Sequence, residues 1–201
     1  MNKKGIFLSF EGPEASGKSS QIKEISKYLK KKKISHVITR EPGGTFVSEK
    51  IRNIILNNKY NISNIEEILL LMASRLNHVN KVIKPALKKG KLVISDRYCD
   101  STFVYQGTKE SIKLHKQLLN NFLPNKTFLF LLTTKQILKR LNLRKKLNKY
   151  DVKNKKFHNK IIRRYKKISK TNKRFIIINA EKSFNEIQID LRKKINRLLN
   201  K

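Results

Sequence analysis

Five short apolar runs recur along the chain, and between them apolar residues return every three or four positions. The runs cover residues 6–10, 36–39, 92–96, 128–132 and 175–178. Short apolar runs bounded by polar turns predict buried strands, and the helical spacing between them predicts connecting helices. This alternation favours the α/β class, with a five-stranded parallel sheet and helices on both of its faces.

Signals for helix ends support this pattern. Ser63-x-x-Glu66 and Ser183-x-x-Glu186 have the form of capping boxes and predict helix starts. Pro85 lies inside the longest helical pattern, so we expect a bend or a new helix start near Val82. Later helices are expected at residues 99–106, 111–123, 134–147 and 153–169.

The most informative stretch joins the first strand to the first helix. It has the Gly-x-x-x-x-Gly-Lys-Ser spacing of a phosphate-binding loop and reads Gly12-Pro13-Glu14-Ala15-Ser16-Gly17-Lys18-Ser19-Ser20. Glycines let the backbone turn its N–H groups inward, and the helix that follows adds unpaired N–H groups at its positive end. We therefore expect Lys18 to contact the β and γ phosphates of ATP, and the Ser19 hydroxyl to bind Mg²⁺.

Two polar residues end the third strand, at the edge where parallel α/β sheets bind ligands. Asp96 has the position of a carboxylate that holds Mg²⁺ directly or through water, and a helix N-cap is the alternative role. Arg97 can make bidentate contact with a second phosphate, which suits an acceptor phosphate or the transferring group. Arg40 and Arg75 are further candidates, although each could equally be a surface arginine.

Glu14 is unexpected in a loop that binds polyphosphate, because its carboxylate repels the ligand. It either accepts a hydrogen bond from a substrate hydroxyl, helps to place Mg²⁺, or is a tolerated variation.

Two basic helices between the fourth and fifth strands could form a mobile lid at about residues 140–157 that excludes water. Solvated basic helices are the alternative. On a helix over 134–147, Arg140 and Arg144 would share one face.

The composition bounds the class of protein. A chain of 201 residues suits a single domain over 1–201, and its 48 Lys and Arg against 14 Asp and Glu give a net charge of +34. The basic residues are spread over the chain without interleaved aromatic residues, so a solvated surface is favoured over a nucleic-acid site. The chain has no long apolar run and begins close to the first strand, and its single cysteine, Cys99, cannot form an internal disulfide. We expect no membrane partner, no signal peptide and a cytoplasmic location.

Several motifs occur in the order found in bacterial thymidylate kinases, which the chain resembles from about residue 6 to 107 and more loosely beyond. They are residues 10–21, Thr39-Arg40-Glu41-Pro42-Gly43-Gly44-Thr45, Ile83-Lys84-Pro85-Ala86-Leu87, and Asp96-Arg97-Tyr98 with Ser101 and Tyr105-Gln106-Gly107. The resemblance implies a P-loop kinase fold with a helical lid. It further implies transfer of the γ-phosphoryl group of ATP to dTMP, with Mg²⁺, by a homodimer.

The resemblance also implies roles for individual residues. The loop residues Gly12, Pro13, Glu14, Ala15, Ser16, Gly17, Lys18, Ser19 and Ser20 bind ATP, and Ser19 serves Mg²⁺. Glu14 contacts the deoxyribose 3′-hydroxyl and Arg97 the acceptor phosphate. The thymidylate pocket falls at Glu41, Pro42, Arg52, Arg75, Ser101, Tyr105 and Gln106. Ala15 stands where some relatives have an arginine, so the catalytic arginine comes from the lid, with Arg140 and Arg144 as candidates.

The chain departs from the family pattern in two places. Leu71 stands where a phenylalanine usually stacks on thymine, which predicts weaker thymine affinity. Asn148-Lys149-Tyr150-Asp151 replaces a lid motif that usually contains arginine, and lysine lacks the bidentate fork. Two other interpretations stay open, namely a P-loop kinase for a different nucleotide and a basic nucleic-acid-binding ATPase.

Overall fold

The fold contains one parallel sheet, seen in a computed structural model that describes residues 5–57, 60–107 and 109–200. Its strands are β1 (Ile6–Glu11), β2 (His36–Arg40), β3 (Leu92–Asp96), β4 (Lys126–Leu131) and β5 (Phe175–Asn179). They pair in parallel in the order β2-β3-β1-β4-β5. The predicted five-stranded α/β sheet is therefore confirmed. The expectation about a signal peptide concerns residues 1–4, which lie outside the described residues.

Helices connect the strands throughout. They are α1 (Lys18–Lys31), α2 (Phe46–Leu56), α3 (Asn64–His78), α4 (Lys84–Lys88), α5 (Cys99–Tyr105), α6 (Lys109–Leu119), α7 (Thr134–Leu141), α8 (Lys155–Lys170) and α9 (Phe184–Leu199). Both predicted capping boxes are present, at the starts of α3 and α9. Within the described part of the chain, no helix is both long and apolar enough to span a membrane.

The long helical pattern after Ser63 is interrupted where Pro85 predicts it. A π-helical turn, η1 (Val79–Ile83), joins α3 to α4, and Pro85 lies in the first turn of α4. Proline is tolerated there because the first N–H groups of a helix have no intrahelical partner. The bend or new helix start expected near Val82 is thus observed as a new helix, which begins at Lys84.

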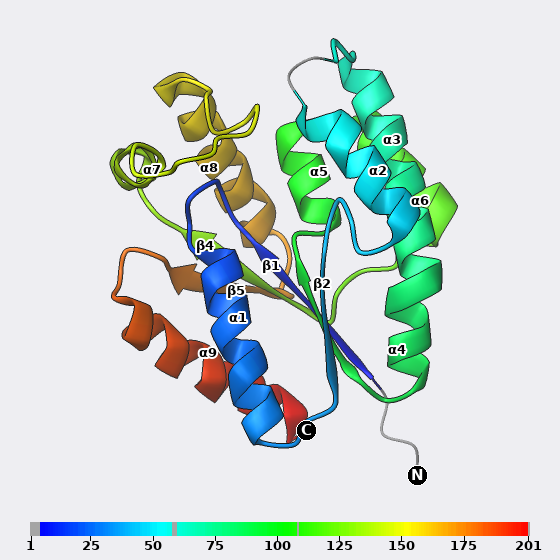
Figure 1. The fold of residues 1–201 in the computed structure, drawn as a ribbon, viewed down its shortest axis with the longest axis vertical. Coiled ribbons are helices and arrows are strands. Elements are labelled where there is room, and N and C mark those ends of the chain that lie inside the picture. The colour runs from blue at the N-terminus through cyan, green and yellow to red at the C-terminus, as the bar shows by residue number, and fades with distance from the viewer. Residues whose placement is uncertain (1–4, 58–59, 108, 201) are drawn as a thin grey trace.

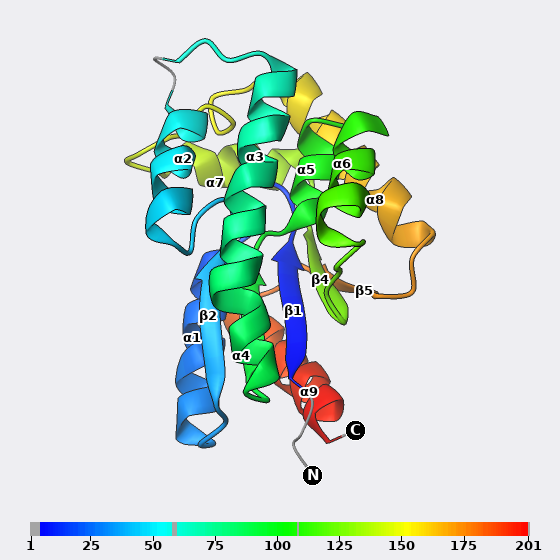
Figure 2. The ribbon, with the colours of Figure 1, turned by 90° about the vertical axis from the view of Figure 1, so that its right-hand side faces the viewer.

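The helices cover both faces of the sheet (Figure 1). Apolar residues of α1, α7 and α9 pack on one face, against Leu8 and Phe10 of the central strand β1. Residues of η1, α4, α5 and α6 pack on the other face against Phe7, and α8 packs there against Leu129 of β4. Successive side chains of β1 point to opposite faces of the sheet. Since helices cover both faces, apolar residues of β1 are buried on each side. Figure 2 shows α2, α3, α5 and α6 grouped beyond the carboxyl ends of the strands.

Two helices are shorter than predicted. α6 ends at Leu119 instead of 123, because Asn120 and Asn121 adopt left-handed backbone conformations with φ of 48° and 54°. α7 ends at Leu141 instead of 147, and an irregular loop, residues 142–154, follows it. The prediction that Arg140 and Arg144 share a helical face is therefore wrong, since Arg144 lies in the loop.

Local hydrogen bonds explain why this loop is not helical. The side-chain Oδ1 of Asn148 accepts from the backbone N–H of Tyr150 at 2.8 Å. The Asp151 carboxylate accepts from the backbone N–H of Asn148 at 3.0 Å. Such side-chain bonds offer the backbone an alternative to helical pairing. We call residues 142–154 the lid loop.

Candidate active site

The turn between β1 and α1 has the backbone geometry of a phosphate cradle. Gly12 has φ of 143°, and a Cβ at this position would collide with the carbonyl oxygen of Phe130. Gly17 has φ of 85° and precedes α1, whose N-terminus has no side-chain cap. The N–H groups of the first turn of α1 are therefore available to a bound anion.

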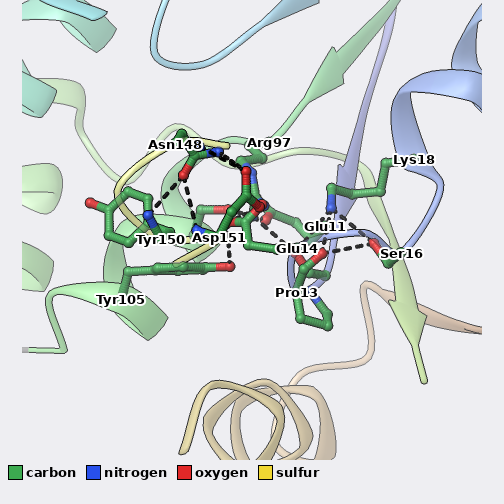
Figure 3. Close-up of polar contacts among 12 residues, drawn as sticks. Glu11, Pro13, Glu14, Ser16, Lys18, Arg97, Tyr105, Asn148, Tyr150 and Asp151 are labelled. Carbon is green, nitrogen blue, oxygen red and sulfur yellow. Dashed lines mark hydrogen bonds and ion pairs between the residues drawn. The ribbon is translucent and has the colours of Figure 1, made fainter. Parts of the chain in front are cut away.

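Lys18 folds back over this turn (Figure 3). Its Nζ donates to the carbonyl oxygens of Gly12 and Pro13, at 3.1 and 2.9 Å, and to Ser16 Oγ at 2.9 Å. Burial first, and the nearby Arg97 second, lower the pKa of Lys18 to about 8. A polyphosphate would stabilise the charged amine, so an anion is its natural partner.

Two oxygen donors meet where α1 starts and β3 ends. Ser19 Oγ donates to Asp96 Oδ2 at 2.5 Å. No cluster of three His, Cys, Asp or Glu side chains that could hold a metal occurs in residues 5–57, 60–107 and 109–200. This donor set fits Mg²⁺, which combines one or two protein ligands with waters and substrate phosphates.

Arg97 connects the phosphate loop to α5. Its Nη2 donates to Glu14 Oε1 at 2.9 Å, and its Nη1 donates to Gly12 O at 2.9 Å and Ser101 Oγ at 3.0 Å. The Tyr105 hydroxyl also donates to Glu14 Oε1, at 2.9 Å. Burial alone would raise the pKa of Glu14, but Arg97 and other donors outweigh it and hold the pKa below its ordinary value. The loop carboxylate thus stays charged beside the guanidinium group.

A buried carboxylate shares hydrogen-bond partners with Arg97, and the sequence analysis gave it no role. Glu11, at the end of β1, accepts from Ser101 Oγ at 2.6 Å and from the Tyr165 hydroxyl at 3.1 Å. Both of these residues also contact Arg97. Burial and then a neighbouring carboxylate raise the pKa of Glu11 to about 7. An acidic residue closing an apolar strand is the sequence signal that could have identified it.

Arg75 is a second buried guanidinium group, and it comes from α3. Its Nε donates to Glu41 Oε2 at 2.7 Å and its Nη2 to Thr102 Oγ1 at 2.8 Å. Only 1% of the arginine is exposed. A buried ion pair of this kind fixes the orientation of the guanidinium plane. Nearby, Arg52 donates to the carbonyl oxygen of Pro42 at 2.8 Å, while Arg40 pairs with Glu49 at 2.8 Å.

One cavity of about 960 Å³ joins these groups. Most of the predicted site residues line it: Glu14, Ala15, Ser16, Gly17, Lys18, Ser19, Ser20, Glu41, Pro42, Arg52, Leu71, Arg75, Asp96, Arg97, Ser101, Tyr105, Gln106 and Arg144. The structure therefore brings residues from the phosphate loop, α2, α3, α5 and the lid loop to a single site.

Three of the predicted residues do not line this cavity, namely Gly12, Pro13 and Arg140. Gly12 and Pro13 contribute carbonyl oxygens to Lys18. Arg140 donates to the carbonyl oxygens of Ala15, at 3.2 Å, and Ala180, at 2.8 Å. In this conformation Arg140 therefore holds the backbone of the phosphate loop and does not point into the cavity.

The lid loop adds Asn148 and Tyr150 to the cavity wall, which the sequence analysis did not predict. Figure 3 shows both residues, with Asp151, beside Arg97 and Tyr105. The Tyr150 ring packs edge-on against Tyr105, with centroids 5.1 Å apart. An aromatic residue inside a basic polar segment is the signal that could have pointed to it.

A phosphate cradle and a second group of guanidinium side chains, joined by one cavity, define a P-loop phosphotransferase with two anionic ligands. A family model described as "Thymidylate kinase" matches residues 10–191. The chain is 39% identical to the thymidylate kinase of Caldicellulosiruptor saccharolyticus, covering 98% of this chain and 99% of that protein. It is 38% identical to the thymidylate kinase of Mycoplasma mobile, covering 98% and 100%.

A solved structure agrees with these sequence comparisons. The crystal structure of thymidylate kinase from Ehrlichia chaffeensis superposes with a TM-score of 0.75 at 27% identity, covering 96% of this chain and 99% of the other. The chain belongs to the thymidylate kinase family. The resemblance inferred from the motifs is confirmed, and so is the α/β P-loop kinase fold.

Proposed function

We propose that the chain transfers the γ-phosphoryl group of ATP to dTMP, giving dTDP and ADP on the way to dTTP. The observation that carries this is the single cavity that joins the phosphate loop to Arg97 and Arg75. Two nucleotides bound in it would bring their phosphates together between Lys18 and Arg97. The names of the relatives support dTMP as the acceptor.

The residues act by positioning and electrostatic stabilisation. The loop N–H groups and Lys18 bind the β and γ phosphates, while Arg97 binds the acceptor phosphate. Glu14, which already accepts from Tyr105, accepts from the deoxyribose 3′-hydroxyl. Ser19 and Asp96 would hold Mg²⁺, which neutralises phosphate charge when bound.

Gln106 provides a specific contact for the acceptor base. Its Nε2 donates to Glu67 Oε1 at 2.9 Å and to the Tyr150 hydroxyl at 3.2 Å. Its Oε1 is buried without a partner among the described residues. Thymine and uracil have an N3–H that can donate to this oxygen, whereas cytosine has an unprotonated N3. The buried Arg75 can donate to a base carbonyl.

We propose Arg144 as the catalytic arginine of the lid. It lines the cavity, and its side chain is 41% exposed, with one ion pair to Asp151 at 3.1 Å. Its rival Arg140 does not line the cavity and donates to the carbonyl oxygens of Ala15 and Ala180. Lys149 pairs with Glu67 at 2.8 Å. Arg144 is therefore the lid cation best placed to reach a transferring phosphoryl group.

A panel of acceptors tests the proposed reaction. With ATP and Mg²⁺, we expect rapid ADP release with dTMP, about tenfold lower kcat/KM with dUMP for the missing methyl group, and near-background release with dCMP. Chelation of Mg²⁺ should abolish turnover. Efficient use of another monophosphate in place of dTMP would support the different-nucleotide alternative. DNA-stimulated ATP hydrolysis without any monophosphate product would instead identify a nucleic-acid-dependent ATPase.

Leu71 predicts a measurable deficit in acceptor binding. It is 7% exposed and lines the cavity. Leucine covers a base but forgoes an aromatic contact worth about 0.5 to 1.5 kcal/mol. We expect Leu71→Phe to tighten competitive binding of dTMP by about two- to tenfold. No gain in affinity, in a variant that melts at the wild-type temperature, would contradict this explanation.

We propose that the protein forms a homodimer through α2, α3 and α6, of which α3 contacts both of the others (Figure 2). Large apolar side chains are exposed on each of them, namely Phe46, Val47, Ile65, Leu69 and Ile112. Exposed apolar groups on neighbouring helices are typical of an interface. Sedimentation velocity at micromolar concentration should give a dimer, and Leu69→Glu should shift it towards monomer.

We further propose a single domain over 1–201, in which the lid loop is the moving part. This loop falls inside the region of about 140–157 that the sequence indicates. The cytoplasmic location stays a prediction.

A further inference from the structure

Three hydrogen-bond donors converge on the carboxylate of Glu67, between α3, α5 and the lid loop. Gln106 Nε2 donates to Oε1 at 2.9 Å, and the Tyr150 hydroxyl donates to the same oxygen. Lys149 Nζ donates to Oε2 at 2.8 Å. Glu67 is only 8% exposed, so these contacts form in a site largely removed from water. One acidic group thus binds the lid loop and the residue proposed to contact the base.

The carboxylate dictates how the Gln106 amide is oriented. An ionised carboxylate accepts hydrogen bonds only, so it binds the NH₂ group of the amide and repels its oxygen. The amide oxygen must then face the other way, and it is this Oε1 that is buried without a partner. A buried acceptor without a donor is costly, and a ligand N–H relieves that cost.

We infer that Glu67 is a positioning residue for acceptor specificity. It holds the Gln106 amide with Oε1 as the group offered to the base, and its contacts with Lys149 and Tyr150 attach the lid loop to the same carboxylate. The inference rests on the proposed function and names the residue that sets its base preference.

The lysine at position 149 fits this arrangement better than an arginine would. An ammonium group is a point charge and occupies a single oxygen of Glu67, which leaves the other for Tyr150 and Gln106. An arginine commonly binds both carboxylate oxygens in a fork. The departure from the family lid motif therefore keeps one oxygen free for the amide.

The variant Glu67→Gln tests the inference, because a glutamine can donate an N–H and so allow the Gln106 amide to turn over. We expect kcat/KM for dTMP to fall about 10- to 100-fold. For dCMP, whose N3 accepts a hydrogen bond, we expect kcat/KM to stay the same or to rise. The dTMP/dCMP ratio should therefore drop at least about tenfold. A purely structural role would lower kcat/KM equally for both acceptors and leave their ratio unchanged.

Two further variants separate the parts of the inference. Lys149→Met removes the ion pair while keeping the Glu67 carboxylate, and should raise KM for both acceptors by a similar factor with the ratio retained. Glu24→Gln makes the same charge change at a half-buried carboxylate of α1 that does not line the cavity, and should leave kcat/KM for both acceptors unaffected. If Glu67→Gln is unstable, Glu67→Asp is the alternative variant. It keeps the negative charge on a shorter side chain, and the dTMP/dCMP ratio should also fall.

The outcomes are distinguishable. An unchanged dTMP/dCMP ratio in folded Glu67→Gln or Glu67→Asp overturns the inference while leaving the proposed function standing. Wild-type enzyme that fails to phosphorylate dTMP overturns the proposed function instead. Circular dichroism and thermal melting of each variant show which of them are folded.

Discussion

Lys18→Met is expected to lower kcat for ADP formation about 100- to 1000-fold at saturating ATP and dTMP. The ammonium group is the only side-chain cation from the phosphate loop in the described cavity wall. It would stabilise the charge that develops on the transferring phosphoryl group, and methionine keeps the length of the stem without that charge. A coupled assay of ADP release measures the effect.

The same variant should remain folded, which separates catalysis from stability. Burial lowers the pKa of Lys18 to about 8, so the free protein disfavours the charged amine that the proposed mechanism requires. Removing it costs hydrogen bonds to the loop but relieves desolvation, and we expect the midpoint of thermal unfolding not to decrease. Lys31→Met, at the exposed end of α1, is the matched control and should turn over normally. Undiminished turnover in Lys18→Met would refute the assignment of the phosphate loop.

The phosphate loop and the sheet could be predicted because short-range patterns encode them. Apolar runs identify the strands, since both faces of this sheet are covered. The glycine spacing identifies the loop, because Gly12 and Gly17 adopt backbone conformations that other residues rarely adopt. The positions of Lys18, Ser19 and Asp96 follow once loop and sheet are known.

The lid could not be predicted in the same way. Residues 142–154 have no apolar period, and their conformation depends on side-chain to backbone bonds from Asn148 and Asp151. The roles of Glu11 and Glu67 depend on partners distant in sequence, such as Tyr165 and Lys149. The capping box predicts that Glu66 lies in the first turn of a helix, but it gives no information about the role of Glu67, the next residue.

Arg144→Ala is expected to lower kcat about 1000-fold, the effect typical of an arginine that stabilises a transferring phosphoryl group. KM for dTMP should change little, because in the proposed mechanism Arg97 binds the acceptor phosphate. Arg144→Lys should recover part of the rate, since it restores charge without the bidentate fork. Steady-state kinetics with both substrates varied separates the two parameters.

Arg140→Ala should behave differently, because its guanidinium group holds the carbonyl oxygens of Ala15 and Ala180. Losing these charge-assisted bonds should lower the free energy of unfolding by about 1.5 to 3 kcal/mol. We expect kcat to fall less than in Arg144→Ala, since the other loop residues proposed to bind ATP are unchanged. The comparison decides between the two arginines. Full activity in Arg144→Ala, together with a 1000-fold loss in Arg140→Ala, would reverse the assignment. That outcome would also imply that the lid rearranges when both nucleotides bind.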